Sequence, residues 1–427
     1  EKFTLSGKMS HDTSNETGED ITPELAAVYS NTFDDDTFGV ALSVSHQRRD
    51  FQKQQANIQG WQANVALPTN LSPENVVDPR PINDDGERIG NHFFPRDMNY
   101  GIENIERERT NGQLTLQYAP TDDLIITTDY TYTNAITGMN SIGWGMWNDY
   151  GGNINGYELD ENGTVIYADI GGNDGSFSAS RSTTEVDAKS IGLNIDWQVS
   201  ESFNFSVDYH DSSNEIDNGA DEGLGSHGTL VLGSDQLDTK IYYYRIGDVP
   251  SAEIHWKNGG TELLPSEIDS HFSQFIHSPG KSEVQQLQLH GLWENDVDSP
   301  WVNVKFGLAR TEQEISGSNA WSGLIGGFLF NPSWPEIFPD GMFVRNSTDD
   351  FLDNISGGGS QLSPNYYYTF DFDEAVARSE AFLTNDVLGG EDYFATDAYH
   401  PMGTYAEGAI EEIEEQLASE DKSFLTQ

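Results

Sequence analysis

Residues 114–130 read LTLQYAPTDDLIITTDY, and residues 193–209 follow the same pattern as LNIDWQVSESFNFSVDY. In each stretch, apolar residues fall on every second position on both sides of a short polar break. Successive side chains leave a strand on opposite sides, so this period predicts strands with one apolar and one polar face. The breaks at 120–123 and 199–202 are short enough for tight turns, and each stretch is therefore predicted to form a β-hairpin.

The same alternation recurs along the chain, with further short turns predicted at 34–37 and 296–300. The predicted hairpins lie near residues 3–52, 111–133, 189–212 and 283–315. The connections between them are long and rich in Gly, Asn and Asp, and they cover residues 53–110, 134–188, 213–282 and 316–418. Within the last connection, helices are predicted near 373–384 and 406–417.

Short turns that alternate with very long connections are typical of outer-membrane β-barrels, which have short periplasmic turns and long extracellular loops. Soluble β-sandwiches usually have loops of similar, modest length at both ends. The sequence therefore predicts an all-β fold, in which residues 1–427 form part of one antiparallel, up-and-down transmembrane β-barrel. We expect the chain to be an internal piece of that barrel.

The composition excludes some classes of protein and leaves others open. The chain has 21 Lys and Arg against 71 Asp and Glu, a formal net charge of -50. Nucleic-acid binding relies on cationic side chains that displace counterions, so nucleic acid is not an expected partner. Disulfides and thiolate metal sites are excluded because the chain has no Cys. The mean hydropathy of -0.57 is compatible with a barrel, in which only every second strand residue faces lipid.

No catalytic or nucleotide-binding motif is complete in this sequence. Residues 223–228 (GLGSHG) match the dinucleotide fingerprint in letters, but no apolar strand precedes them and no apolar helix follows. Residues 280–282 (GKS) resemble the end of a phosphate-binding loop, but Phe275 stands where the first Gly is required. The sequence contains neither a His-Glu-x-x-His zinc motif nor a Gly-x-Ser-x-Gly nucleophile elbow. We therefore expect a protein that is not an enzyme.

Two acidic segments could hold a hard cation such as calcium through carboxylate oxygens. They contain Asp160 and Glu161 in one segment and Asp217, Asp221 and Glu222 in the other. Neither has the spacing of a calcium-binding loop, and acidic runs are commonly solvated surface. A structural calcium ion is the only cofactor that the sequence leaves open.

Aromatic residues in the long connections are the candidate ligand site. They are Trp144, Trp147, Tyr150, Trp321 and Trp334. Flat apolar rings beside Asn and Asp side chains suit sugar recognition, because a sugar offers both an apolar face and hydroxyl groups. The alternative is that these rings pack the long connections against one another.

Residues 99–133 resemble the barrel of TonB-dependent outer-membrane receptors, in particular a subfamily found in Xanthomonas and Caulobacter. The similarity lies in the segment IERER at 105–109, the strand that follows, the APTD turn at 119–122 and the returning strand. The resemblance implies a barrel of about 22 strands that is plugged by an N-terminal domain. It also implies a location in the outer membrane and import of a scarce nutrient, using energy from the inner-membrane TonB complex that acts through the plug. This sequence contains neither the plug nor its coupling box.

Three functional hypotheses follow from these patterns. The first is a receptor that imports a carbohydrate or oligosaccharide, with a siderophore or other iron chelate as the alternative ligand. The second is a secreted, calcium-dependent carbohydrate-binding or adhesive β-protein, and the third is a glycoside hydrolase. In the first, side chains such as Leu116, Ile126, Ile195 and Phe205 face lipid; in the others, they lie sealed in a dry protein interior.

Overall fold

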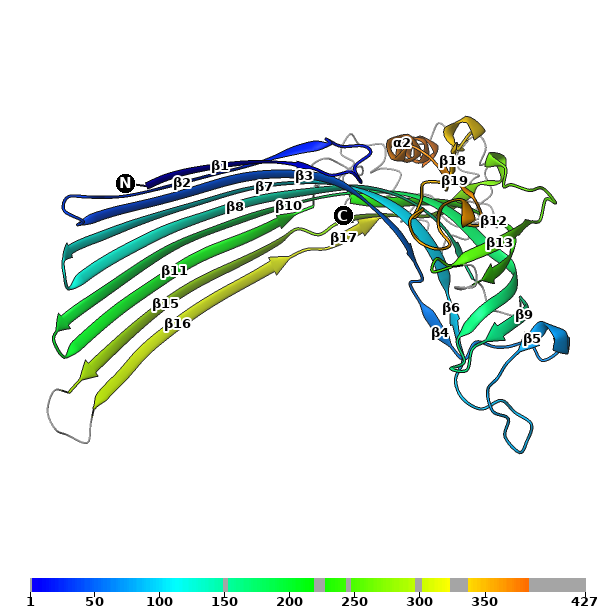
Figure 1. Cartoon of the computed structure of the whole chain (residues 1–427), viewed down its shortest axis with the longest axis horizontal. Helices are drawn as coiled ribbons and strands as arrows, with labels where there is room; N and C mark the ends of the chain where they lie inside the picture. Colours follow the sequence, from blue (N-terminus) through cyan, green and yellow to red (C-terminus); the bar gives the residue numbers. More distant parts are fainter. Residues whose placement is uncertain are drawn as a thin grey trace, which may run out of the picture.

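The computed structural model shows that the described part of the chain is mostly antiparallel β-strand (Figure 1). No helix among the described residues is long and apolar enough to cross a membrane. The α-helix α2 spans Phe372–Leu383 and lies near the end of the described chain. The structure describes residues 2–148, 153–218, 227–242, 247–295, 302–322 and 337–383.

The main path of the sheet follows the order β1-β2-β3-β7-β8-β10-β11-β15-β16, and every neighbouring pair on this path is antiparallel. Figure 1 shows these strands side by side in one curved layer. In the described residues β1 and β16 are the two edges of this path, so the sheet is open. The strands are β1 (Lys2–His11), β2 (Ile21–Phe33), β3 (Phe38–Asn57), β7 (Asp97–Thr121), β8 (Leu124–Trp147), β10 (Val165–Ser200), β11 (Phe203–Asp217), β15 (Gly280–Glu294) and β16 (Asn303–Gly317).

The short turns lie together at one end of the sheet, on the left in Figure 1. The turns predicted at 34–37, 120–123 and 199–202 are confirmed, because each joins two strands of an antiparallel pair. In the first turn Asp34, Asp35 and Asp36 all have positive φ, a conformation that Asp tolerates better than most residues. The turn predicted at 296–300 lies outside the described residues.

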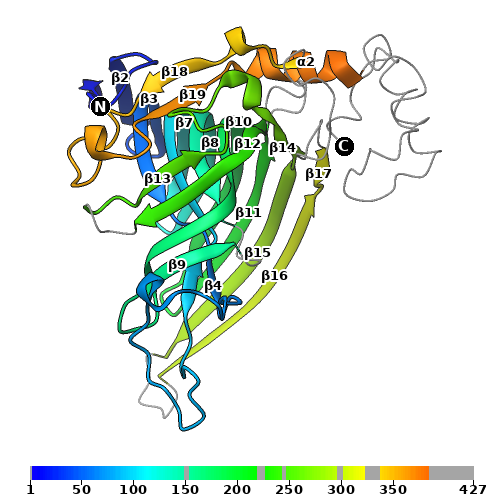
Figure 2. The same ribbon diagram turned by 90° about the vertical axis from the view of Figure 1, so that its right-hand side faces the viewer.

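At the opposite end the sheet forks and shorter elements gather (Figure 2). Strand β10 pairs with β11 over 185–200 and with β12 over 167–182. The additional strands are β4 (Trp61–Ala63), β5 (Val76–Val77), β6 (Phe93–Pro95), β9 (Ile154–Leu159), β12 (His227–Tyr242), β13 (Ser251–Trp256), β14 (Asp269–His277), β17 (Ala320–Ser322), β18 (Val344–Ser347) and β19 (Tyr366–Thr369). The 3-10 helices are η1 (Pro73–Asn75), η3 (Pro265–Glu267), η4 (Asp340–Met342) and η5 (Gly359–Gln361).

The long connections were expected to be loops, and this expectation is wrong for much of their length. Strand β7 begins inside the predicted loop 53–110, β8 and β10 occupy most of 134–188, β12 to β14 lie within 213–282, and β17 to β19 lie within 316–418. In the middle of these extensions, at 103–110, 134–141 and 180–188, polar side chains lie on both faces, so the apolar alternation is interrupted there while backbone pairing between β8 and β10 continues without a shift. The helix predicted near 373–384 is confirmed as α2, and the one near 406–417 lies outside the described residues.

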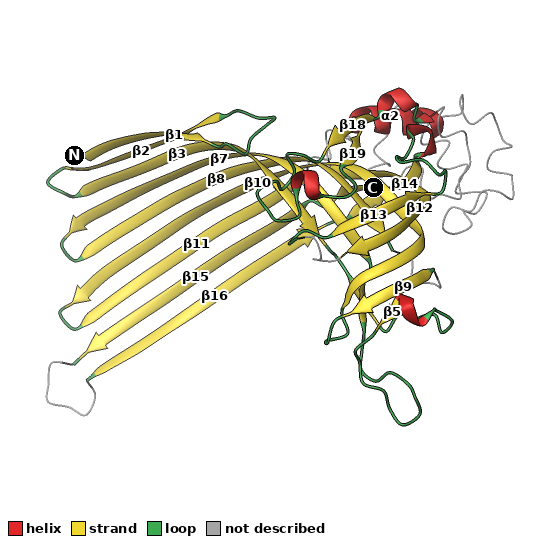
Figure 3. Ribbon diagram, turned by 45° about the vertical axis from the view of Figure 1, so that its right-hand side comes forward, coloured by secondary structure: helices red, strands yellow, loops and turns green. Residues whose placement is uncertain are grey.

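Two parts of the sheet differ in how they bury apolar side chains. The base, at the end with the short turns, comprises residues 2–47, 111–133, 189–215 and 282–317. The cap, at the forked end, comprises the described residues within 58–100, 142–182, 227–277 and 337–383 (Figure 3). Every buried hydrophobic residue of the described chain lies in the cap. In the base, Leu116, Ile126, Ile195 and Phe205 are only half-buried and are not enclosed between two sheets.

Candidate functional site

The register of the base places apolar side chains on one face across all nine strands. Directly paired residues in an antiparallel sheet point to the same side. Phe3 pairs with Tyr29, which pairs with Leu42 and then Leu114. Farther along, Ile126 pairs with Ile195, Val207, Leu289 and Leu308 in succession. We call this side of the sheet the apolar face and the other side the polar face.

The apolar face is open in the described structure. Its most accessible side chains are exposed by 37% for Leu193 to 70% for Leu5, and others, such as Leu116 and Ile126, are half-buried. Phe306 lies directly over Gly291, where an added Cβ would meet the ring at 2.2 Å, so neighbouring strands pack against one another within the face. Soluble monomers rarely leave so large a continuous apolar surface uncovered.

Aromatic rings border the apolar face near the turns. Phe33 and Phe38 pair across the first turn with ring centroids 6.4 Å apart. Trp197 and Trp293 occupy the corresponding positions on later strands, and both are exposed. Such rows of aromatic residues are typical of the headgroup boundary of a membrane.

Charged residues border the apolar face on the side towards the cap. In β10 the apolar residue Ile191 is followed on the same face by Lys189, Asp187 and Glu185. On β15, Lys281 forms ion pairs with neighbouring carboxylates, including that of Glu215 at 3.0 Å. The apolar face therefore has a sharp polar boundary at this edge.

The height of the apolar face agrees with the thickness of a membrane. On β7 it extends from Tyr118 near the turn to the first charged residue on that face, Glu108. Ten residues rise about 34 Å along a strand, and a tilt of about 40° reduces this to about 26 Å. Transmembrane barrels present an apolar band of about 25 Å.

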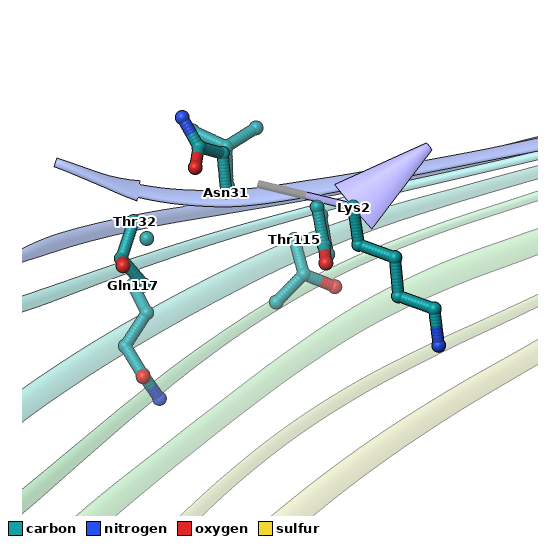
Figure 4. Close-up of a pocket in the computed structure, with 9 residues that line it drawn as sticks. Lys2, Asn31, Thr32, Thr115 and Gln117 are labelled. Carbon is teal, nitrogen blue, oxygen red and sulfur yellow. The ribbon is translucent and has the colours of Figure 1, made fainter. Parts of the chain in front are cut away.

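The polar face carries mainly hydroxyl and amide side chains. Gln117 donates to the Thr127 hydroxyl at 3.2 Å, and Asn204 donates to the carboxylate of Asp196 at 2.7 Å. A groove of about 340 Å³ lies near β1, β2, β3 and β7. Figure 4 shows Thr115 and Gln117 on one side of the sheet. The groove is lined by Lys2, Ser30, Asn31, Thr32, Gly39, Val40, Ala41, Thr115 and Gln117.

Trp144 is a packing residue of the cap and has no open face. Its side chain is 4% exposed. Its ring stacks on Tyr367 at 4.0 Å and on Tyr100 at 5.6 Å, while Phe351 meets it edge-on at 4.6 Å. In this arrangement the ring fixes the segment around β19 against strands β7 and β8. Trp144 therefore packs connecting segments together, as in the alternative to a ligand site.

The phenol groups around this cluster are structural and neutral. Burial raises the pKa of Tyr366 to about 12, and its hydroxyl oxygen accepts the backbone N–H of Leu263 at 2.9 Å. Burial also raises the pKa of Tyr100, whose hydroxyl donates to the carbonyl of Pro250. These contacts join the 247–277 and 337–383 segments to the main sheet.

Trp147 has a different environment from Trp144. It lies three positions further along β8, so its side chain leaves the opposite, polar face. The ring is 46% exposed, and the guanidinium carbon of Arg96 lies 4.7 Å from its centroid. Trp144 and Trp147 therefore cannot hold one ligand between them.

The other candidate residues give less structural information. Trp321 lies on β17, with its backbone opposite Ile276. Tyr150 and Trp334 lie outside the described residues. Five aromatic residues were expected to share one site, and Trp147 is the member whose described side chain offers an exposed ring.

The acidic segments and the Gly-Lys-Ser sequence have ordinary structural positions. Asp160 accepts the backbone N–H groups of Asn162 at 2.9 Å and Thr164 at 2.7 Å, so it stabilises a tight turn. Gly280 and Lys281 lie in the extended strand β15 and form no phosphate-binding turn. Asp221 and Glu222 lie outside the described residues. Within the described part, no group of three or more His, Asp or Glu side chains is placed to hold a metal ion.

A buried ionic cluster in the cap was not predicted. The Asp78 carboxylate accepts three side-chain hydrogen bonds from Arg80: Nε donates to both oxygens, at 3.0 and 3.3 Å, and Nη2 donates to one of them at 2.7 Å. Arg80 also donates to Nδ1 of His92 at 2.8 Å, and Nε2 of that ring donates to the carbonyl of Val65 at 2.9 Å. Arginine can only donate, so this geometry requires His92 to carry its proton on Nε2.

Burial alone raises the pKa of the Asp78 carboxyl, but the hydrogen bonds and charge of Arg80, aided by Arg88, hold it below its ordinary value. The cluster ties residues 65–92 together and stabilises the cap. No signal in the sequence distinguished this Asp and Arg from the many exposed ones.

Comparison with known proteins adds no family assignment. No protein-family model matches the chain, and no curated protein matches it significantly.

Proposed function

We propose that the chain forms part of the wall of a transmembrane β-barrel in the outer membrane. It would belong to a receptor of the TonB-dependent type that imports a nutrient. The observation that supports this most directly is the apolar face, which is continuous over nine strands and uncovered in the described structure. Lipid is a partner that such a face accepts, because the backbone of each inner strand is already paired within the sheet.

Three further observations support the same proposal. The apolar face is about as high as a bilayer core and is bordered by aromatic residues on one side and charged residues on the other. The turns at 34–37, 120–123 and 199–202, which join neighbouring strands of the main path, lie at one end of the sheet, where a barrel would have its periplasmic turns. The cap lies at the other end, where extracellular segments would meet a ligand.

The ligand that this proposal favours is a carbohydrate. Hydroxyl and amide groups predominate on the polar face, and they exchange hydrogen bonds readily with sugar hydroxyls. The net charge of -50 opposes the approach of anionic chelates. A secreted β-protein would need another layer over the apolar face, and the described chain supplies none in the base.

Site-directed labelling tests the proposed orientation. The chain contains no Cys, so one introduced cysteine reports a single position. On intact cells a membrane-impermeant maleimide should label the cap variant Asp85→Cys and leave the turn variant Asp122→Cys unlabelled. Both should react after lysis.

Equal labelling of the two variants on intact cells would contradict the orientation. Recovery of the folded chain in solution without detergent would contradict the membrane location itself.

A further inference from the structure

We infer that Trp147 is the platform against which the ring of a neutral saccharide stacks, at the cap end of the polar face. Its hydrogen-bonding neighbours are Arg96 and Asp174. The inference rests on the proposed transport function and names a contact site for its ligand.

The sheet register brings these residues together. Trp147 is the last residue of β8, and it pairs with Asp97 of β7 on one side and with Asp174 of β10 on the other. Directly opposed side chains in an antiparallel sheet share a face, with Cβ atoms about 5 Å apart. The indole therefore has a carboxylate-bearing residue on each side, but the two differ in exposure. The Asp97 carboxylate is only 4% exposed and accepts the backbone N–H of Gln59 at 2.7 Å, whereas that of Asp174 is 29% exposed and lies 4.0 Å from the ring of His271.

Arg96 completes the site from the residue before β7. Its backbone is fixed, because its N–H donates to the carbonyl of Gly60 at 2.7 Å and its carbonyl accepts from Asn148 at 2.8 Å. Its guanidinium donates no hydrogen bond to any residue that the structure describes, and its nearest acidic atom is on Asp97 at 3.7 Å. The exposed part of the guanidinium can therefore donate to a ligand while its carbon lies over the indole.

The charges around Trp147 select an uncharged ligand. Asp97 and Asp174 repel anions, as does the protein as a whole, while Arg96 repels cations. A carboxylate and a guanidinium together suit vicinal hydroxyl groups, which donate to one and accept from the other. The half-exposed indole suits the C–H face of a pyranose ring.

Trp197 provides a matched control. It is 46% exposed, the same as Trp147, but it lies on the apolar face near the turns. Replacement of either ring by Ala removes an equally exposed indole. Only one of the two removals should affect the proposed saccharide site.

The test is a binding titration of the full chain in detergent, followed by tryptophan fluorescence and calorimetry. The probes are maltohexaose, cellohexaose and laminarihexaose, with tetragalacturonate as the charged comparison. We expect at least one neutral probe to bind the unaltered chain and tetragalacturonate to bind more weakly. Trp147→Ala should weaken the neutral probe about tenfold, the equivalent of one aromatic contact. Trp197→Ala should leave its affinity within about twofold.

Arg96→Lys tests whether the planar guanidinium or only its positive charge contributes to binding. Lysine retains the positive charge but loses the planar donors, so we expect affinity to fall by a few-fold, less than in Trp147→Ala. Far-UV circular dichroism of each variant shows whether the sheet is retained.

The inference is overturned if no neutral probe binds, if tetragalacturonate binds best, or if Trp147→Ala and Trp197→Ala have equal effects. These outcomes leave the membrane proposal standing, provided that the chain still requires detergent and labels with the expected orientation. A chain that is folded and soluble without detergent would instead remove the proposed function, whatever it binds.

Discussion

The two ends of strand β8 present the same kind of side chain to very different surroundings. At the base, Ile126 and Tyr130 alternate with polar residues and remain partly exposed. At the cap, Trp144 and Met146 continue the same face and are buried beneath the 337–383 segment. The cap thus makes its own dry interior, whereas the base has apolar side chains that no described part of the chain covers.

This contrast shows that alternation alone does not reveal what covers a strand. Burial of apolar surface stabilises by about 25 cal/mol per Å², whether the cover is protein or lipid. The cap obtains its cover from distant parts of the sequence, and the proposed cover of the base is the bilayer. Four substitutions test whether the two ends differ in this way.

The largest effect is expected for Trp144→Ala. Loss of the ring between Tyr100 and Tyr367 should destabilise the cap by about 3–5 kcal/mol, because a large cavity would remain. Thermal unfolding in detergent, with limited proteolysis of the 337–383 segment, measures the change. Trp197→Ala removes an equally large side chain from the base, and in this variant the cap should keep its resistance to protease.

Arg80→Met should destabilise the cap by about 3 kcal/mol, because it leaves the carboxylate of Asp78 buried without its partner. Hydrogen exchange in residues 65–92 measures this locally. Arg310→Met, at an exposed ion pair with Glu312 in the base, is the control and should change little.

The pair of Asp78 and Arg80 also predicts that the stability of the cap depends on pH. The folded-state pKa of Asp78 lies below its ordinary value of 3.8, so the unfolded chain binds the proton more readily. The stabilisation is therefore complete above about pH 4 and is lost as the pH falls through the folded-state pKa. Protection against hydrogen exchange in residues 65–92 should decrease as the pH falls in the unaltered chain. In Arg80→Met, this protection should depend less on pH.

Leu116→Arg tests the cover of the base directly. A charge near the middle of a lipid-facing strand costs about 2–4 kcal/mol, so folding into liposomes should fail or slow markedly. Its neighbour Thr115 lies on the polar face, and Thr115→Arg should insert normally. Equal insertion of the two variants would show that the two faces are not distinguished by lipid.

The smallest effect is expected for Arg181→Met. Arg181 forms a two-point ion pair with Asp373 of α2, at 2.7 and 2.9 Å, but both side chains are partly exposed to solvent. An exposed pair contributes at most about 1 kcal/mol, so α2 should remain docked through its apolar contacts. Release of α2 in this variant, measured by proteolysis, would show that the helix depends on charge and not on packing.

The sequence predicted the base well because each strand there has a polar and an apolar side. Residues 114–130 specify both strands and the turn, and the observed register pairs Tyr118 with Ile126. The extensions could not be predicted in the same way. In β10, residues 174–184 read DGSFSASRSTT, in which small and polar side chains give no period, and backbone pairing to β8 and β12 holds the strand.

The candidate site was predicted only in part. The sequence placed Trp144 and Trp147 together in one long loop, and only the structure shows that they lie on a strand with their side chains on opposite faces, one of which is covered. The cover depends on Phe351 and Tyr367, which are distant in sequence. The contacts between Asp78 and Arg80 were equally hidden, because many Asp and Arg residues of this acidic chain look alike until the fold buries some of them.

The unbroken pairing of β8 with β10 has a mechanical consequence. From Trp147 to Leu124 the two strands stay in register over about 78 Å, with no bulge at which they could bend locally. A force applied at the cap end would therefore be transmitted along the whole length of the paired strands. Relative motion of the two ends would then have to come from gradual flexing of many strands together, and not from a joint at any one of them.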